Sequence, residues 1–240
     1  MTLTTFLAAA PIGIAILIGA AVQGSTGFGV GLVATPIIAL VDPTLLPSVL
    51  VLVSVPLPLL TGLREFRSVR LGWLGWSLAG RVPGNVAGAF AAAWFSPRLL
   101  GLAVGFAVLA AVAASLARWA PRVTRINLMV AGALSGAAGT ATSIGSPPIA
   151  LLMQRQAGPE VRATLSMFFF VGATLSVALL AVTGLVTPRH LLWAAGLAVP
   201  MLLGFWLSGP ARRFVDRGRV KACILALVLA SAIALVLTNW

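Results

Sequence analysis

Residues 23–31 read Gln-Gly-Ser-Thr-Gly-Phe-Gly-Val-Gly, and residues 135–148 read Ser-Gly-Ala-Ala-Gly-Thr-Ala-Thr-Ser-Ile-Gly-Ser-Pro-Pro. Each of these glycine-rich runs interrupts an apolar stretch, 6–42 in the first case and 127–153 in the second, that is too long for one membrane span. Non-helical backbone is tolerated at membrane depth only where it is buried in protein or lines a water-filled cavity. We therefore expect two broken helical hairpins, whose interruptions contact something polar.

The composition of the whole chain indicates that its solvent is lipid. Of 240 residues, 60% are hydrophobic and 8% are charged, whereas a soluble domain carries about 25% charged residues. We expect an all-α polytopic membrane protein of about eight hydrophobic helices, multi-pass in the cell membrane. Besides the two hairpins, six apolar stretches predict full spans: 44–62, 72–95, 99–117, 163–186, 191–209 and 222–238.

Charge and chemistry-bearing residues exclude several classes of function. The chain has 16 basic and 4 acidic residues, but the basic ones are too sparse to follow a phosphate backbone, so no nucleic-acid partner is expected. One Cys and one His are too few for a disulfide framework, a zinc site or an iron–sulfur cluster, so neither a metal nor a cofactor is expected. An intramembrane enzyme is disfavoured because no nucleophile and base are paired.

The basic residues predict an orientation, because short cytoplasmic loops are rich in Lys and Arg. If the basic loops are cytoplasmic, both ends of the stretch 127–153 face the cytoplasm, whereas Asp42 and the N- and C-termini lie outside. Thirteen of the sixteen basic residues fall in alternate loops: 64–70, 118–125, 155–162 and 212–221.

The two hairpins predict an internal repeat. Repeat one covers about residues 1–117 and repeat two about 126–240, each with a hairpin followed by three spans, and an odd number of crossings inverts the second copy. A shift of 112 positions places glycines and prolines of the two interruptions on one another: Gly24 on Gly136, Gly27 on Gly139 and Pro36 on Pro148. We read residues 1–240 as a single membrane domain.

Polar residues in the two interruptions are candidates for binding an anion. A half-helix that starts after each interruption offers free N–H groups and the positive end of its dipole, and two inverted copies would direct both ends at one point. The alternative is that Gly27 and Gly31 form a small-residue packing motif without a ligand. The candidate ligands are Gly24, Ser25, Thr26 and Gly27 in the first run and Thr140, Thr142, Ser143 and Ser146 in the second.

Arg81 is the only charged residue well inside a predicted span. A mid-membrane charge costs about 2.5–3.5 kcal/mol on insertion scales and usually faces the interior of the bundle. No acidic residue lies within a neighbouring helical turn, so we expect the substrate to be its counter-ion, with Asn85 on the same face one turn later. The alternative is that Arg81 reaches the interface or pairs with backbone carbonyls.

Asp42 borders the first hairpin on the predicted outer side. It is a weak candidate for a carboxylate that couples transport to a proton, because an Asp-Pro pair is more often a cap or a turn. His190 lies in the short outer loop 187–190, where we expect it to be solvated.

The chain resembles the TauE/SafE family of membrane permeases, the sulfite exporter family. The resemblance rests on the glycine-rich run with its downstream proline, Gly24 to Pro36, and its echo, Gly136 to Pro148. The third helix of each half adds a proline-to-glycine spacing, Pro83 to Gly88 and Pro200 to Gly204. The second run is richer in Thr and Ser than is usual in the family.

The resemblance implies a transport domain for small sulfur-containing anions, such as sulfite or organosulfonates, that often carries them outward. With the predicted anion site, we expect a secondary transporter working by alternating access, coupled to a proton or sodium ion or driven by the gradient of its substrate. An anion channel with the same hairpins as its filter is the alternative. The sequence leaves open whether the chain forms a homo-oligomer.

Overall fold

The computed structural model describes residues 3–96, 121–153 and 158–215, together with isolated positions from 98 to 113, residues 155 and 156, and isolated positions from 229 to 237. The predicted spans 99–117 and 222–238 lie outside the described residues, apart from those isolated positions. Every regular element in the described ranges is a helix, as the sequence predicted. By length and composition, three of these helices can cross a membrane, and their apolar parts are Ala9–Thr26, Gly158–Val182 and Pro188–Gly209.

The first hairpin consists of a long helix, α1 (Leu3–Thr26), and a shorter one, α2 (Val30–Val41). Helix α1 ends where Gly27 and Gly29 adopt φ values of 90° and 126°, a region that L side chains rarely enter. The interruption is therefore confined to residues 27–29 and is shorter than the glycine-rich run that predicted it.

The second hairpin has the same plan, with α7 (Arg125–Thr142) followed by the short helix α8 (Ser146–Met153). The side chain of Thr124 caps α7 by accepting a hydrogen bond from the N–H of Asn127 at 3.2 Å. Helix α7 ends at Thr142 and is followed by Ser143, which adopts a left-handed conformation with φ 63°. In α8 the prolines occupy the second and third positions, where their missing N–H groups have no partner within the helix.

The predicted span 44–62 is helical along most of its length, as Ser48–Arg64, but this segment starts later than predicted and is interrupted once. It contains the short 3-10 helix η1 (Pro43–Leu45), then α3 (Ser48–Ser54) and α4 (Pro56–Arg64). Pro56 has no N–H to continue the hydrogen bonding of α3, so the helix is interrupted at Val55. The predicted spans 72–95, 163–186 and 191–209 correspond, with shifted ends, to three long helices: α5 (Leu71–Trp94), α9 (Gly158–Val182) and α10 (Pro188–Val215). A second short 3-10 helix, η2 (Phe66–Ser68), precedes α5.

Helices α5 and α7 pack with their backbones in contact. Gly80, Gly84 and Gly88 form a stripe along α5, and a Cβ added to Gly84 would lie 2.9 Å from the carbonyl carbon of Ala133 on α7. Since real Cβ atoms essentially never approach so closely, these positions accept only glycine without a shift of the helices. Small residues of this kind let helices associate closely in a membrane.

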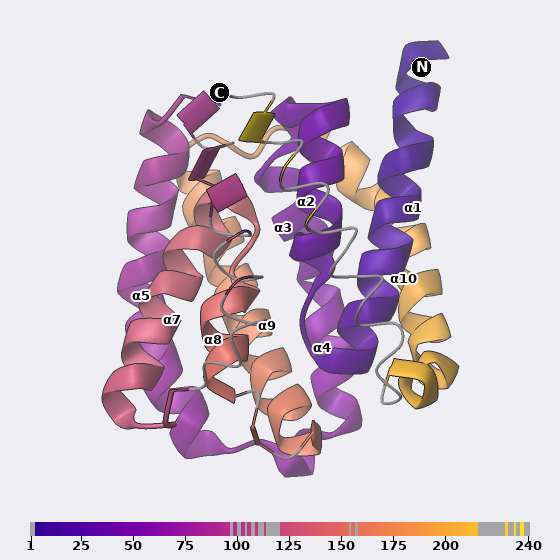
Figure 1. The fold of residues 1–240 in the computed structure, drawn as a ribbon. Helices are drawn as coiled ribbons and strands as arrows, with labels where there is room; N and C mark the ends of the chain where they lie inside the picture. Colours follow the sequence, from indigo (N-terminus) through magenta and orange to yellow (C-terminus); the bar gives the residue numbers. More distant parts are fainter. Residues whose placement is uncertain are drawn as a thin grey trace.

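Helix α1 packs against α10 in the same manner (Figure 1). A Cβ on Gly204 would lie 3.0 Å from the carbonyl carbon of Leu17, and one on Gly24 would lie 2.6 Å from Cβ of Ser208. The first helix of each hairpin therefore packs on a long helix from the other half of the sequence.

The buried apolar side chains of the described residues form several clusters, one of which joins α3 to α9 around Val51 and Leu180. The largest unites α1, α2, α3, α4 and α10 around Ile16, Ile38 and Leu50, which are fully buried. The second unites α7, α8 and α9 around Ile149 and Phe168. Many large apolar side chains of α5 and α10 are instead exposed, as expected for helices that face lipid.

Ion pairs mark the two ends of the bundle. At one end, Glu65 after α4 pairs with Arg162 of α9 at 2.9 Å. In the same region, the hydrogen bond from Arg70 to Glu160 raises the pKa of the Arg70 guanidinium above its ordinary value. At the other end, Asp42 pairs with Arg189 at 2.8 Å.

Candidate functional site

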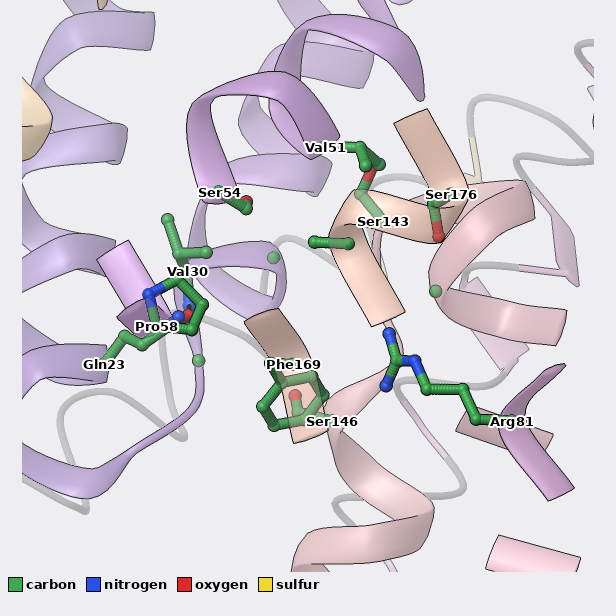
Figure 2. A pocket seen from close by; sticks show the side chains of 15 residues that line it. Gln23, Val30, Val51, Ser54, Pro58, Arg81, Ser143, Ser146, Phe169 and Ser176 are labelled. Atoms are coloured by element: carbon green, nitrogen blue, oxygen red, sulfur yellow. Dashed lines mark hydrogen bonds between the residues drawn. The ribbon is translucent and has the colours of Figure 1, made fainter. Parts of the chain in front are cut away.

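A small cavity lies where the two interruptions meet. A Cβ on Gly31, in the first turn of α2, would lie 3.1 Å from the carbonyl carbon of Ser143, which shows how closely the hairpins approach. The space open to the centre of a water molecule measures about 60 Å³. Figure 2 shows Arg81 extending into this region from one side, with Ser146 and Phe169 between it and Gln23, Val30 and Pro58 on the other side, and with Ser143 above it in the view.

Arg81 of α5 is buried and is the only charged residue among the described residues that line the cavity. Its Nη1 donates a hydrogen bond to Oγ of Ser135 at 3.2 Å. Its Cζ lies 4.3 Å from the ring centroid of Phe168 and 5.3 Å from that of Phe169. Its Nε has no hydrogen-bond partner in the described structure.

The described carboxylates do not neutralise this charge. Asp42, Glu65 and Glu160 each pair with another arginine at one end of the bundle. Burying a charge is costly unless it is paired and hydrogen-bonded, so Arg81 has capacity for an anion.

Gly172 of α9 makes room for the guanidinium of Arg81. A Cβ on Gly172 would lie 2.5 Å from Nη2 of Arg81 and closer still to Cζ and Nε. The guanidinium of Arg81 therefore lies directly on the backbone of α9, against Gly172 and beside the rings of Phe168 and Phe169. No pattern in the neighbouring sequence identifies this position, which we did not predict.

Asn85 lies one turn after Arg81 and is fully buried, but it does not line the cavity. Its Nδ2 donates to the carbonyl oxygen of Gly172 at 2.8 Å and to Oγ of Ser176 at 3.2 Å. Asn85 thus ties α5 to the segment of α9 on which Arg81 rests, and it supports the site from outside.

The candidates in the second run divide into two groups. Ser143 and Ser146 line the cavity. Oγ of Thr140 lies 2.8 Å from Oγ of Ser176, while Thr142 bonds to the backbone of its own turn. Only the first pair is placed to contact a molecule in the cavity.

The four candidates in the first run do not line the cavity. Gly24 contacts Ser208 of α10, and Ser25 donates to the carbonyl oxygens of Ala21 and Ser208. The hydroxyl of Thr26 bonds to the backbone at the end of α1. A Cβ on Gly27 would lie 2.9 Å from Cα of Arg162, so this glycine is required by packing.

Gln23, which we did not predict, lines the cavity together with Gly29, Val30 and Gly31. Its Oε1 accepts a hydrogen bond from the N–H of Val30 at 3.1 Å, so a side chain already occupies one donor at the start of α2. The start of α8 also offers fewer donors than we expected, because Pro147 and Pro148 have no N–H. The signal for Gln23 was its position, as the polar residue that opens the first run.

Asp42 lies far from this cavity, at the end of the bundle where α10 begins. Its carboxylate pairs with Arg189 and accepts a hydrogen bond from the N–H of Thr44, which makes it the cap of η1. His190 bonds to the backbone of the same region. The described residues contain no cluster of three or more potential metal ligands.

The family model described as sulfite exporter TauE/SafE matches residues 12–235 of the chain. No curated protein and no solved structure matches the chain significantly.

Proposed function

Because this chain belongs to the TauE/SafE sulfite exporter family, we propose that it is a secondary transporter for a small sulfur-containing anion. The family is one of membrane anion exporters, and the apolar helices agree with that coarser assignment. Sulfite, or an organosulfonate with a small substituent, is the substrate in this proposal, and it moves outward by alternating access.

The observation that carries the proposal is the state of Arg81. Its guanidinium is buried, lines the cavity and has no carboxylate partner among the described residues. Guanidinium groups bind oxyanions through short, charge-assisted hydrogen bonds. Ser146 supplies a hydroxyl group that replaces part of the hydration of the anion, whereas the hydroxyl of Ser143 donates to the carbonyl oxygen of Pro47 at 3.1 Å.

The size of the cavity supports a small substrate. One water molecule needs roughly 10–15 Å³ of the space open to its centre. A cavity of about 60 Å³ on that measure holds a few waters or one anion of the size of sulfite. A sulfonate with a long tail requires the walls to move apart.

The proposal includes an inverted repeat, with the end that carries Glu65, Arg70 and Arg162 in the cytoplasm. The exchange of helices between halves, α1 with α10 and α7 with α5, supports two related halves built around one site. The N-terminus is then outside. In each half a short helix, α2 or α8, follows an interruption. Secondary transporters form their central site with such interrupted segments.

The nature of the energy source stays a prediction. Coupling to a proton or a sodium ion remains part of the proposal, with Asp42 as its weak candidate and the gradient of the substrate as the alternative. An anion channel is the alternative mechanism. Saturating flux and counterflow in proteoliposomes favour the carrier, whereas flux that rises linearly with concentration favours the channel.

The experiment that tests the proposal compares Arg81→Ala, Arg81→Lys and the control Arg125→Ala. Sulfite flux is measured in proteoliposomes and sulfite binding by calorimetry in detergent. We expect Arg81→Ala to abolish both, because the buried positive charge is gone. Arg81→Lys should also bind weakly, since an ammonium lacks the planar fork of donors.

The control separates loss of the site from loss of the fold. Arg125 is exposed, at the start of α7 over Trp76, so its removal should leave flux unchanged. Removing a buried charge that has no carboxylate partner among the described residues should not lower thermal stability strongly, although its bond to Ser135 is lost. Wild-type flux in Arg81→Ala would exclude this residue from the transport mechanism.

A further inference from the structure

Ser135 of α7 lies between Arg81 and the interruption of the second hairpin. Its side chain is fully buried, and its Oγ accepts the hydrogen bond from Nη1 of Arg81 at 3.2 Å. The same Oγ donates a short hydrogen bond to the carbonyl oxygen of Gly145, the last residue before α8. A chain of two hydrogen bonds thus joins the buried charge to the interruption.

The direction of these bonds is fixed by the chemistry of the groups. A guanidinium only donates and a carbonyl oxygen only accepts, so the single hydrogen of the Ser135 hydroxyl must point to Gly145. Hydrogen bonds in such a chain polarise one another, and a positive charge at one end strengthens the bond at the other. The charge of Arg81 therefore strengthens the hydrogen bond from Ser135 to the carbonyl oxygen of Gly145.

The backbone around Gly145 packs so closely on α7 that a shift of α7 at Ser135 must also move the interruption. A Cβ on Gly145 would lie 2.5 Å from the carbonyl oxygen of Ser135 and 3.0 Å from Cα of Gly139. The interruption therefore packs directly against the backbone of α7. Ser143 and Ser146, on either side of Gly145, line the cavity that Arg81 enters (Figure 2).

We infer that Ser135 is a positioning residue that couples Arg81 to the second interruption. Through it, an anion bound to Arg81 and the placement of Ser143 and Ser146 around that anion reinforce each other. The inference rests on the proposed function, because it assumes that an anion binds at Arg81. It assigns Ser135 no contact with the anion.

The first test is the affinity for sulfite of Ser135→Ala, measured by calorimetry in detergent, with Ser166→Ala as the matched control. Ser166 is also fully buried on a helix, and its hydroxyl has no partner among the described residues. We expect Ser135→Ala to weaken binding by roughly tenfold or more, the size of a hydrogen bond to a charged group. Ser166→Ala should bind sulfite as the wild type does, and equal affinities of Ser135→Ala and wild type would overturn the inference.

The second test separates positioning from a merely structural role. Ser146→Ala is introduced into the wild type and into Ser135→Ala, and the loss of sulfite affinity is compared in the two backgrounds. If Ser135 places Ser146, that loss should shrink in the Ser135→Ala background, because the hydroxyl of Ser146 is already displaced. Equal losses in the two backgrounds would contradict the coupling.

A third comparison applies if Ser135→Ala does not fold. Ser135→Thr and Ser135→Val introduce the same branched shape, with a methyl group in Val where Thr carries its hydroxyl, so they disturb packing to a similar extent. We expect the Thr variant to bind sulfite more tightly than the Val variant by about tenfold. Equal affinities would overturn the role of the hydroxyl.

The outcomes for the inference and for the proposed function are distinct. If wild-type protein binds no sulfite, or binds it equally well without Arg81, the proposed function fails. If binding depends on Arg81 but not on the hydroxyl of Ser135, only the coupling through Ser135 fails.

Discussion

Gly172→Ala is the smallest change that should displace the guanidinium of Arg81. The added Cβ would lie 2.5 Å from Nη2 and closer still to Nε, whereas real Cβ atoms keep at least 3.0 Å from their neighbours. The obstructing atoms are the far end of a flexible side chain, so we expect the side chain of Arg81 to move while α9 keeps its place. The guanidinium then loses its contact with Phe168, its bond to Ser135 and its position in the cavity.

The expected magnitude follows from the bonds that are lost. Hydrogen bonds to charged groups contribute about 1.5–3 kcal/mol, which corresponds to a roughly tenfold to hundredfold weaker binding of sulfite. Thermal stability should fall only modestly, because alanine favours the helix over glycine by about 1 kcal/mol and offsets part of the crowding.

The assay is calorimetric titration of sulfite into purified protein, with thermal unfolding followed by circular dichroism. Gly75→Ala and Gly196→Ala are the controls, since a Cβ at either position meets no atom within 4 Å. Sulfite affinity within twofold of wild type in Gly172→Ala would refute the argument that Arg81 requires this glycine.

Three further predictions follow from the packing and the cavity. Gly84→Ala should lower the melting temperature in a thermal scan, because its Cβ would lie 2.9 Å from the backbone of Ala133, while Gly75→Ala should not. Ser146→Leu should abolish sulfite binding by filling the cavity, whereas Thr26→Leu should reduce stability and leave the affinity of the folded fraction intact; the reverse pattern would contradict the division between site and packing. A tag on the N-terminus should be accessible to an impermeant reagent from outside intact cells, and labelling only after lysis would invert the proposed orientation.

The two hairpins could be predicted from the sequence because their cause is local. Runs of glycine, serine and proline cannot continue an apolar helix, and the helices do end at Thr26 and Thr142. The family was also identified correctly. The break at Val55 had a local cause as well, Pro56, but the apolar run around it concealed the interruption.

The direction in which each side chain of the first run points could not be predicted, because it depends on contacts with residues far away in the sequence. The rotation of α1 about its own axis is fixed by the contact of Gly24 with Ser208. Ser208 belongs to α10, which lies far away in the sequence. That contact turns Ser25 toward α10, while Gln23 lines the cavity. Spacing within the run contains no information about this choice.

Arg81 could be chosen from the sequence because a single charge in an apolar helix has few alternatives. Its surroundings could not, since Gly172 and Ser135 approach it from two other helices. A glycine or serine in an apolar helix is common, and only the assembled bundle distinguishes these two from the rest.

The exchange of partners between the halves has a consequence for biosynthesis. Ser25 of α1 shares a hydrogen bond with a residue 183 positions later, on α10. At a translation rate of about 5–20 residues per second, α1 waits roughly 10–40 seconds in the bilayer before its partner leaves the ribosome. During that interval its glycine face and its polar side chains are covered only by lipid, by α2 or by the insertion machinery. A chain that is cut short before α10 would therefore keep the contacts of α1 with α2 and α4 but leave uncovered the face of α1 that packs on α10.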